Sequence, residues 1–159
     1  ILMDGMRWDL WQLISNKLRE EISLRIIEEG SLLAYKPTNT ETQLEVLRTS
    51  CFQGEIIAPD QFEGEKGKIV KFAYIDDKVH SLKDDYERFI EEITFQTENR
   101  LIPFIKRLPT GSPILIFADH GFRLNNNYSK QDKYKVPRYL HGGDSFFERI
   151  IPWAMLYKV

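Results

Sequence analysis

Apolar and polar residues alternate along the chain in two ways, and each predicts a different kind of element. Short apolar runs bounded by glycine, proline or acidic residues are typical of buried strands. We expect five strands on this basis, at residues 1–3, 31–35, 69–75, 114–117 and 150–159. Pro152 should interrupt the start of the last strand, because proline cannot donate to a sheet ladder.

Between these runs, apolar residues recur every three or four positions, which is the spacing of an amphipathic helix. A first helix is expected to run to about residue 29 and to end at Gly30. Its apolar stripe consists of Trp8, Trp11, Ile14, Leu18 and Ile22. A second helix should begin with Thr40 as its N-cap, since Thr40 and Gln43 have capping-box spacing.

A long third helix is expected after Ser81, which together with Asp84 has the spacing of a helix start. Its periodic pattern continues to about Leu108. Pro103 lies inside this pattern and removes one backbone donor. We therefore expect a kink or a division of the helix there.

The remaining segments are polar and without periodicity. Residues 53–68 and 123–139 are predicted to be surface loops, and Ser145 and Glu148 have the spacing of a capped turn before the last strand. Strands that alternate with helices of this length predict an α/β fold with a mostly parallel sheet. We expect residues 1–159 to form one domain.

Composition and charge narrow the function only a little. The net charge of -2 gives no overall attraction to long nucleic acid or to an anionic membrane. Cys51 is the only cysteine, and no apolar run is long enough for a membrane span or a signal peptide. We therefore expect a cytoplasmic protein with no membrane partner. Because the sequence opens at Ile1, inside an expected strand, we also expect a truncated domain, a piece of a longer protein.

Acidic and imidazole side chains lie at the ends of the expected strands. They are Asp4 after the first strand, Asp76 and His80 after the third, Asp119 and His120 after the fourth, and His141 before the last. The carboxyl ends of parallel strands share one edge of a sheet, so these side chains are expected to meet in a single cleft. Mixed imidazole and carboxylate ligands favour zinc or manganese.

Each of these residues also has a purely structural explanation. Asp4 precedes Gly5 and would cap the first helix, Asp76 would be an acid at a helix start, and His141 before two glycines would occupy a tight turn. Thr40 would be an N-cap alone. A shared site is favoured because all of these separate explanations would have to hold at once.

Thr40 is also a candidate nucleophile. The N-terminus of a helix offers free N–H groups and the positive end of the helix dipole, which stabilise a phosphate or a developing alkoxide. A threonine hydroxyl held there beside a metal ion is activated for attack.

Five stretches of the sequence resemble the alkaline phosphatase superfamily, and most closely its PglZ domains. They are Leu2-Met3-Asp4-Gly5-Met6-Arg7-Trp8-Asp9, Pro37-Thr38-Asn39-Thr40, Asp76-x-x-x-His80, Ala118-Asp119-His120-Gly121-Phe122, and His141-Gly142-Gly143 followed by Glu148-x-x-x-Pro152. The order and spacing of these stretches span the whole chain. The resemblance implies an alkaline-phosphatase-like three-layer α/β sandwich with a mostly parallel central sheet.

The resemblance also implies two divalent metal ions. Zinc is favoured for both, and manganese is the alternative. Asp4, Thr40, Asp119 and His120 would surround one ion, and Asp76, His80 and His141 would hold the other. Thr40 would attack phosphorus, although Thr38 is a neighbouring hydroxyl that could be confused with it. Arg7 would hold the phosphoryl oxygens, or would form a structural salt bridge behind the site.

The function implied is a metal-dependent phosphodiesterase that acts on nucleotides or nucleic acid, in phage defence or signalling complexes. A phosphomonoesterase and an inactive scaffold module of a defence complex are the alternatives. Basic residues interleaved with tyrosines fit a nucleotide or single-stranded substrate, although a solvated surface loop is the favoured explanation of them. These residues are Arg123, Tyr128, Lys130, Lys133, Tyr134, Lys135, Arg138 and Tyr139, with Asp132 as the one acid.

Overall fold

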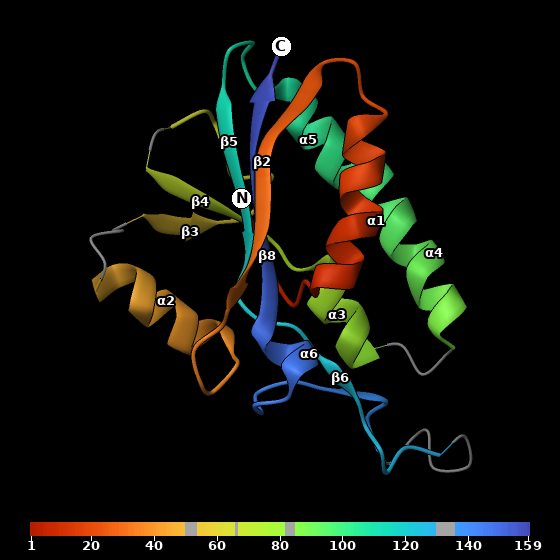
Figure 1. Ribbon diagram of the computed structural model, residues 1–159. Coiled ribbons are helices and arrows are strands. Elements are labelled where there is room, and N and C mark those ends of the chain that lie inside the picture. The colour runs from red at the N-terminus through yellow and green to blue at the C-terminus, as the bar shows by residue number, and fades with distance from the viewer. Residues whose placement is uncertain (50–53, 66, 82–84, 130–135) are drawn as a thin grey trace.

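The computed structural model describes residues 1–49, 54–65, 67–81, 85–129 and 136–159, which form an α/β fold around a six-stranded sheet (Figure 1). The strands, in their order across the sheet, are β2 (Leu24–Leu33), β8 (Ile150–Lys158), β5 (Pro113–Ala118), β1 (Leu2–Met3), β4 (Lys68–Phe72) and β3 (Glu55–Ile57). β8 runs opposite to the other five strands and pairs antiparallel with β2 and β5, whereas β5, β1, β4 and β3 pair in parallel. The sheet is therefore mostly parallel, as predicted.

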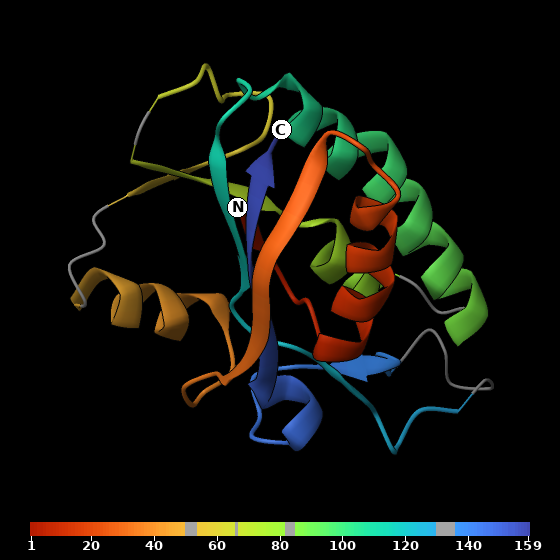
Figure 2. The same ribbon diagram turned by 45° about the horizontal axis from the view of Figure 1, so that its top comes forward.

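Helices lie on both faces of this sheet, which is consistent with a three-layer α/β sandwich. The helices are α1 (Trp8–Arg19), α2 (Thr40–Thr49), α3 (Tyr74–Ser81), α4 (Tyr86–Gln96), α5 (Ile102–Arg107) and α6 (Phe146–Arg149). Helices α1, α3, α4 and α5 cover one face, and α2 lies on the other (Figures 1 and 2). Among the described helices, none is both long enough and apolar enough to cross a membrane.

The core lies between the sheet and the larger helical layer. Along β5, Ile114 and Ile116 are buried against these helices, whereas Leu115 between them is 46% exposed. Alternate strand side chains point to opposite faces, so this pattern shows that β5 has one well-covered face. Trp11 of α1 and Phe89 of α4 are completely buried in the same core.

The first helix is shorter than predicted. It ends at Arg19, and the chain then forms β2, which pairs with the whole length of β8. Ile22, expected on the apolar stripe, is 99% exposed. Gly30 lies within β2 rather than ending a helix, and a Cβ there would come within 2.9 Å of the Trp153 indole nitrogen. Pairing with β8 thus overrides the helical spacing of this segment.

The predicted third strand is also too long. It ends at Phe72, and α3 begins at Tyr74, so Asp76 and His80 lie on a helix that leaves the sheet. Ser81 ends α3 instead of starting the long helix. That helix begins after Asp85, whose carboxylate accepts a hydrogen bond from the Arg88 N–H (3.0 Å). Asp84 lies outside the described residues.

The expected interruption at Pro103 is present. A π-helical segment, η1 (Thr97–Leu101), joins α4 to α5, and Pro103 is the second residue of α5. The wider π turn accommodates a position where the regular hydrogen-bond ladder is broken. The hydroxyl of Thr97 donates to the Ile93 carbonyl (2.8 Å) and contacts the buried Tyr74 hydroxyl (3.0 Å), which anchors this segment beside α3.

Both predicted loops contain strands. Residues 53–68 include β3, which extends the sheet at its edge, and residues 123–139 begin with β6 (Arg123–Leu124), which pairs with β7 (Tyr139–Leu140). Such short strands give no periodic signal of their own. Cys51, Lys130, Asp132, Lys133, Tyr134 and Lys135 lie outside the described residues.

Candidate metal centre

The carboxyl edge of the parallel strands brings the predicted site residues together. Asp4 follows β1 at the middle of the sheet, between the ends of β5 and β4. Two sets of side chains that could hold a metal ion form there, each with ligand atoms within 4.8 Å of one another. We call Asp4, Asp119 and His120 the buried group, and Asp76, His80 and His141 the open group.

Thr40 lies at the buried group, where predicted. Its hydroxyl donates to Asp119 Oδ2 (2.6 Å) and is 3.2 Å from Asp4 Oδ1. His120 Nε2 is 3.3 Å from Asp4 Oδ1 and 3.8 Å from Asp119 Oδ2. Four side chains from three parts of the chain therefore direct oxygen and nitrogen atoms at one another.

The helix start at Thr40 differs in one detail from the prediction. Thr40 is the first residue of α2, and the Thr42 N–H donates to the Asn39 side chain (2.9 Å). Asn39 thus performs the capping that was expected of Thr40. As a result, the Thr40 hydroxyl is not used by its own helix and points to Asp119 instead.

The backbone fixes the orientation of Asp119 and His120. Asp119 Oδ1 accepts hydrogen bonds from the N–H groups of Gly5 (3.1 Å) and His120 (2.9 Å). His120 Nδ1 is 3.0 Å from the Gly121 carbonyl, so Nδ1 carries a proton and Nε2 faces the carboxylates. Gly5 has φ +73, a conformation that glycine adopts without strain, and this allows its N–H to reach Asp119.

Lys71 is a charged member of this site that the sequence analysis did not identify. It lies on β4 opposite Leu2, and its Nζ is 2.5 Å from Asp4 Oδ2. The available signal was a lysine in the middle of an apolar strand. Burial alone would lower the pKa of Lys71, but the Asp4 hydrogen bond and the charges of Asp4, Asp119 and Asp76 raise it.

The buried group balances its own charges. Burial would raise the pKa of Asp4, but hydrogen bonds from His120 and Lys71 outweigh burial and lower it. Burial raises the pKa of Asp119. Burial would likewise lower the pKa of His120, yet the hydrogen bond to Asp4 and the charge of Asp119 raise it to about 9. His120 and Lys71 are therefore the cations that neutralise Asp4.

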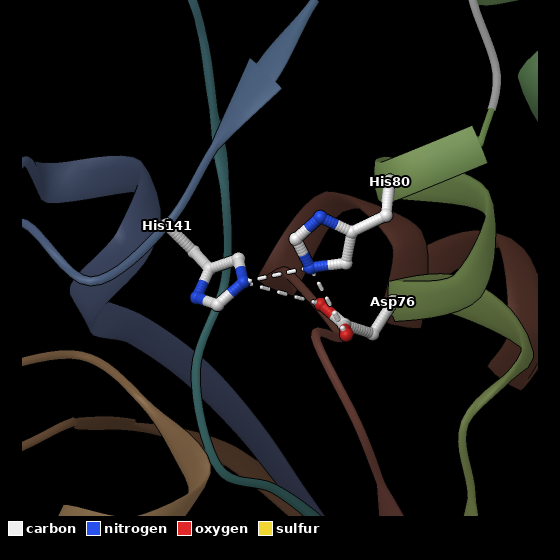
Figure 3. A group of neighbouring side chains, drawn as sticks. All are labelled: Asp76, His80 and His141. Carbon is white, nitrogen blue, oxygen red and sulfur yellow. Dashed lines mark hydrogen bonds and ion pairs between the residues drawn. The ribbon is translucent and has the colours of Figure 1, made fainter. Parts of the chain in front are cut away.

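The open group is formed by α3 and by the loop after β7 (Figure 3). His80 Nε2 and His141 Nε2 are 3.0 Å apart, and they lie 3.4 Å and 3.6 Å from the two carboxylate oxygens of Asp76. His80 reaches this position because it is one helical turn from Asp76 on α3. The prediction that Asp76 and His80 directly follow a strand is therefore wrong, because both lie on α3. They nevertheless lie at the same site.

The donor atoms of the open group fit a metal ion. Asp76 Oδ1 is buried and has no hydrogen-bond partner among the described residues, and the Nε2 atoms of His80 and His141 face the Asp76 carboxylate. Burial, followed by the charge of His120, lowers the pKa of His141, which favours the neutral imidazole that binds metals. Two imidazole nitrogens and a carboxylate are typical ligands of zinc, and they also suit manganese.

The two groups are neighbours. The rings of His120 and His141 stack with their centroids 4.5 Å apart and their planes at 17°. Two residues along the chain from His120, Phe122 packs edge-on against Phe89 (5.4 Å) and against Tyr139 (5.2 Å), which lies two residues before His141. The aromatic side chains thus hold the chain segments on which the two histidines lie.

The loop that carries His141 is tied to the segment that precedes Thr40. The Thr38 hydroxyl donates to the Gly143 carbonyl (2.8 Å), and the Gly142 N–H donates to the Thr38 carbonyl (2.9 Å). Thr38 is fully buried. Its hydroxyl is committed to this loop, which distinguishes it from the hydroxyl of Thr40.

Arg7 takes the structural position that the sequence analysis left open. Its guanidinium forms two hydrogen bonds with Asp9 (2.8 and 2.6 Å) and lies over the rings of Phe122 (4.9 Å) and Phe147 (5.0 Å). Its charge is therefore already paired with that of Asp9. A role in holding phosphoryl oxygens stays a prediction.

The described part of the basic segment lies beside the same loop. Arg123 Nε is 3.2 Å from the buried Glu148 carboxylate, and the Arg138 guanidinium lies 5.5 and 5.7 Å from the ring centres of Tyr128 and Tyr139. Both arginines thus also pack against the protein.

No protein-family model and no curated protein sequence matches the chain.

Proposed function

We propose that this protein is a two-metal phosphoester hydrolase, and specifically a phosphodiesterase that acts on nucleotides or nucleic acid. The observation that carries this proposal is the Thr40 hydroxyl between Asp4 and Asp119, beside two adjoining sets of metal-ligating side chains. A nucleophile and ligands for two cations at one sheet edge are the parts that such a reaction needs. We also propose that the protein acts within a phage-defence or signalling complex.

The chain's own residues would share the work as follows. One divalent ion would be held by Asp4, Thr40, Asp119 and His120, and the other by the open group. Zinc is the favoured metal for both ions, and manganese is the alternative. Bound ions of this kind withdraw charge from phosphoryl oxygens and stabilise an in-line displacement. Asp119 accepts the hydrogen bond of the Thr40 hydroxyl and is placed to take its proton.

In this reaction, the Thr40 oxygen forms a bond to phosphorus while the bond to the leaving alcohol breaks. With a diester this leaves the retained half of the substrate joined to Thr40 through the phosphate, and water would then release it as a phosphomonoester and restore the Thr40 hydroxyl. The preference for a nucleotide rests on Arg138 and the half-buried Tyr128, since cationic and aromatic side chains together suit phosphates and bases. A monoester substrate is distinguished by comparing the turnover of nitrophenyl monoesters and diesters.

Metal removal tests this function directly. Dialysis of the protein against a chelator should reduce hydrolysis of bis(nitrophenyl) phosphate to background, and added Zn²⁺ or Mn²⁺ should restore it. Circular dichroism checks that the chelated protein remains folded. Full turnover by protein shown by elemental analysis to hold no metal would refute the proposal, and the absence of any turnover in metal-loaded protein would favour the scaffold alternative.

The replacement Arg7→Gln separates the two roles of Arg7. We expect it to lower the free energy of unfolding by about 1–3 kcal/mol, because it removes a bidentate ion pair and two cation–π contacts. Diester turnover by the folded fraction should change by less than about tenfold. Denaturant unfolding and steady-state kinetics measure both effects, with Arg25→Gln on the exposed side of β2 as the control. A large loss of kcat without loss of stability would assign the phosphoryl oxygens to Arg7.

A further inference from the structure

The two metal-ligating groups differ in how their charges are satisfied. In the buried group, both oxygens of Asp4 are occupied: Lys71 is 2.5 Å from Oδ2, while His120 and Thr40 are 3.3 and 3.2 Å from Oδ1. A buried carboxylate is stable only when it is paired in this way. This group is therefore complete with the cations that the chain itself supplies.

The open group lacks such an internal cation. No lysine or arginine of the described residues lies within ion-pair distance of Asp76, whose neighbours are His80 and His141. Asp76 Oδ1 has no hydrogen-bond partner among them. A bound cation would satisfy this oxygen, whereas at the buried group a cation has to compete with an ammonium that is already present.

Lys71 can compete with a metal ion for Asp4, and its ammonium group can also move away when an ion binds. Its side chain is 29% exposed, and a lysine ammonium on a flexible four-carbon stem can turn toward solvent at modest cost. Its position is fixed at the base, because Lys71 pairs with Leu2 on the strand that leads directly to Asp4. The ammonium therefore cannot leave the neighbourhood of the site altogether.

We infer that Lys71 acts as an internal cation that competes with the metal ion of the buried group, so that the two ions bind with unequal affinity. The open group is the tight site and the buried group is the weak one. This inference rests on the two-metal site of the proposed function. According to this inference, Lys71 determines that the open group binds its metal ion before the buried group does.

A zinc titration of the folded protein against a competing chromophoric chelator tests this order. The wild-type chain should bind one Zn²⁺ tightly and a second about tenfold or more weakly. In Lys71→Met, the weak site should tighten by about tenfold or more, and the tight site should stay within about threefold of wild type. Adding His80→Ala to both proteins weakens the open group and isolates the effect on the buried group.

Lys17→Met is a matched control, since Lys17 is 30% exposed and paired with Glu20 and Glu98, far from the site on α1. It should leave both affinities unchanged. Lys71→Gln provides a second variant, and thermal unfolding shows that each protein is folded. Equal affinities in the wild type, or a weak site that Lys71→Met leaves unchanged or weaker, would overturn the inference.

The zinc titration is independent of turnover, so the two proposals fail separately. Tightening in Lys71→Met without hydrolysis of any phosphoester would sustain the role of Lys71 and refute the hydrolase. Two equal sites with hydrolysis would do the reverse. If neither the wild type nor the Lys71 variants took up zinc, the role of Lys71 would fall with the metal centre itself.

Discussion

Replacing Thr40 with alanine is expected to lower the turnover of bis(nitrophenyl) phosphate by about 10⁴-fold or more while the protein remains folded. Among the residues that the structure describes, the Thr40 hydroxyl is the one candidate nucleophile that contacts both carboxylates of the buried group, at 2.6 and 3.2 Å. Its removal takes away the atom that forms the bond to phosphorus. The fold should tolerate the change because Asn39, and not Thr40, caps α2.

Two further variants on the same helix make this measurement specific. Thr40→Ser keeps the hydroxyl and should retain turnover within about tenfold of wild type. Thr42→Ala removes a half-buried hydroxyl from the same first turn of α2 and should have little effect. Single-turnover kinetics with metal-loaded protein compares the three. Undiminished turnover by Thr40→Ala would rule out Thr40 as the nucleophile.

The convergence of the site residues was predictable from the sequence because it depends on one simple rule. Residues that follow parallel strands share a sheet edge wherever the strands lie in the chain. Asp4, Asp119 and His120 therefore meet, as expected, once β1 and β5 pair in parallel. The strand-end rule alone predicts one shared cleft; the division into two sets is implied by the family resemblance, and the structure groups these side chains in the same way.

Features that depend on long-range pairing were not predictable. Helical spacing continues past Arg19, and only the presence of β8, more than a hundred residues later, turns the following segment into β2. Lys71 belongs to the site only because β4 lies beside β1 in a register that places it opposite Leu2. In both cases the decisive partner is remote in sequence, so local patterns carry no information about it.

Glu148→Ala is expected to destabilise the protein by about 2–4 kcal/mol, the largest stability effect among these predictions. The Glu148 side chain is completely buried, and it accepts hydrogen bonds from the N–H groups of Gly143 (2.8 Å) and Ser145 (3.2 Å) and pairs with Arg123 (3.2 Å). Alanine would leave these donors without their partner. Denaturant unfolding measures the loss, with Glu45→Ala on the exposed side of α2 as a control that should change stability by less than about 0.5 kcal/mol.

The same replacement should also weaken metal binding, because Glu148 fixes the loop that carries His141. Gly143 lies so close to Glu148 that a Cβ on it would be 3.0 Å from both carboxylate oxygens. Without this anchor, His141 is no longer held beside Asp76 and His80, and zinc affinity at the open group should fall by about 10- to 100-fold. Glu148→Gln separates charge from anchoring, since its amide oxygen still accepts one N–H while its amide nitrogen faces the other. An intermediate affinity for Gln would support anchoring, whereas full zinc affinity in folded Glu148→Ala would show that His141 is positioned without it.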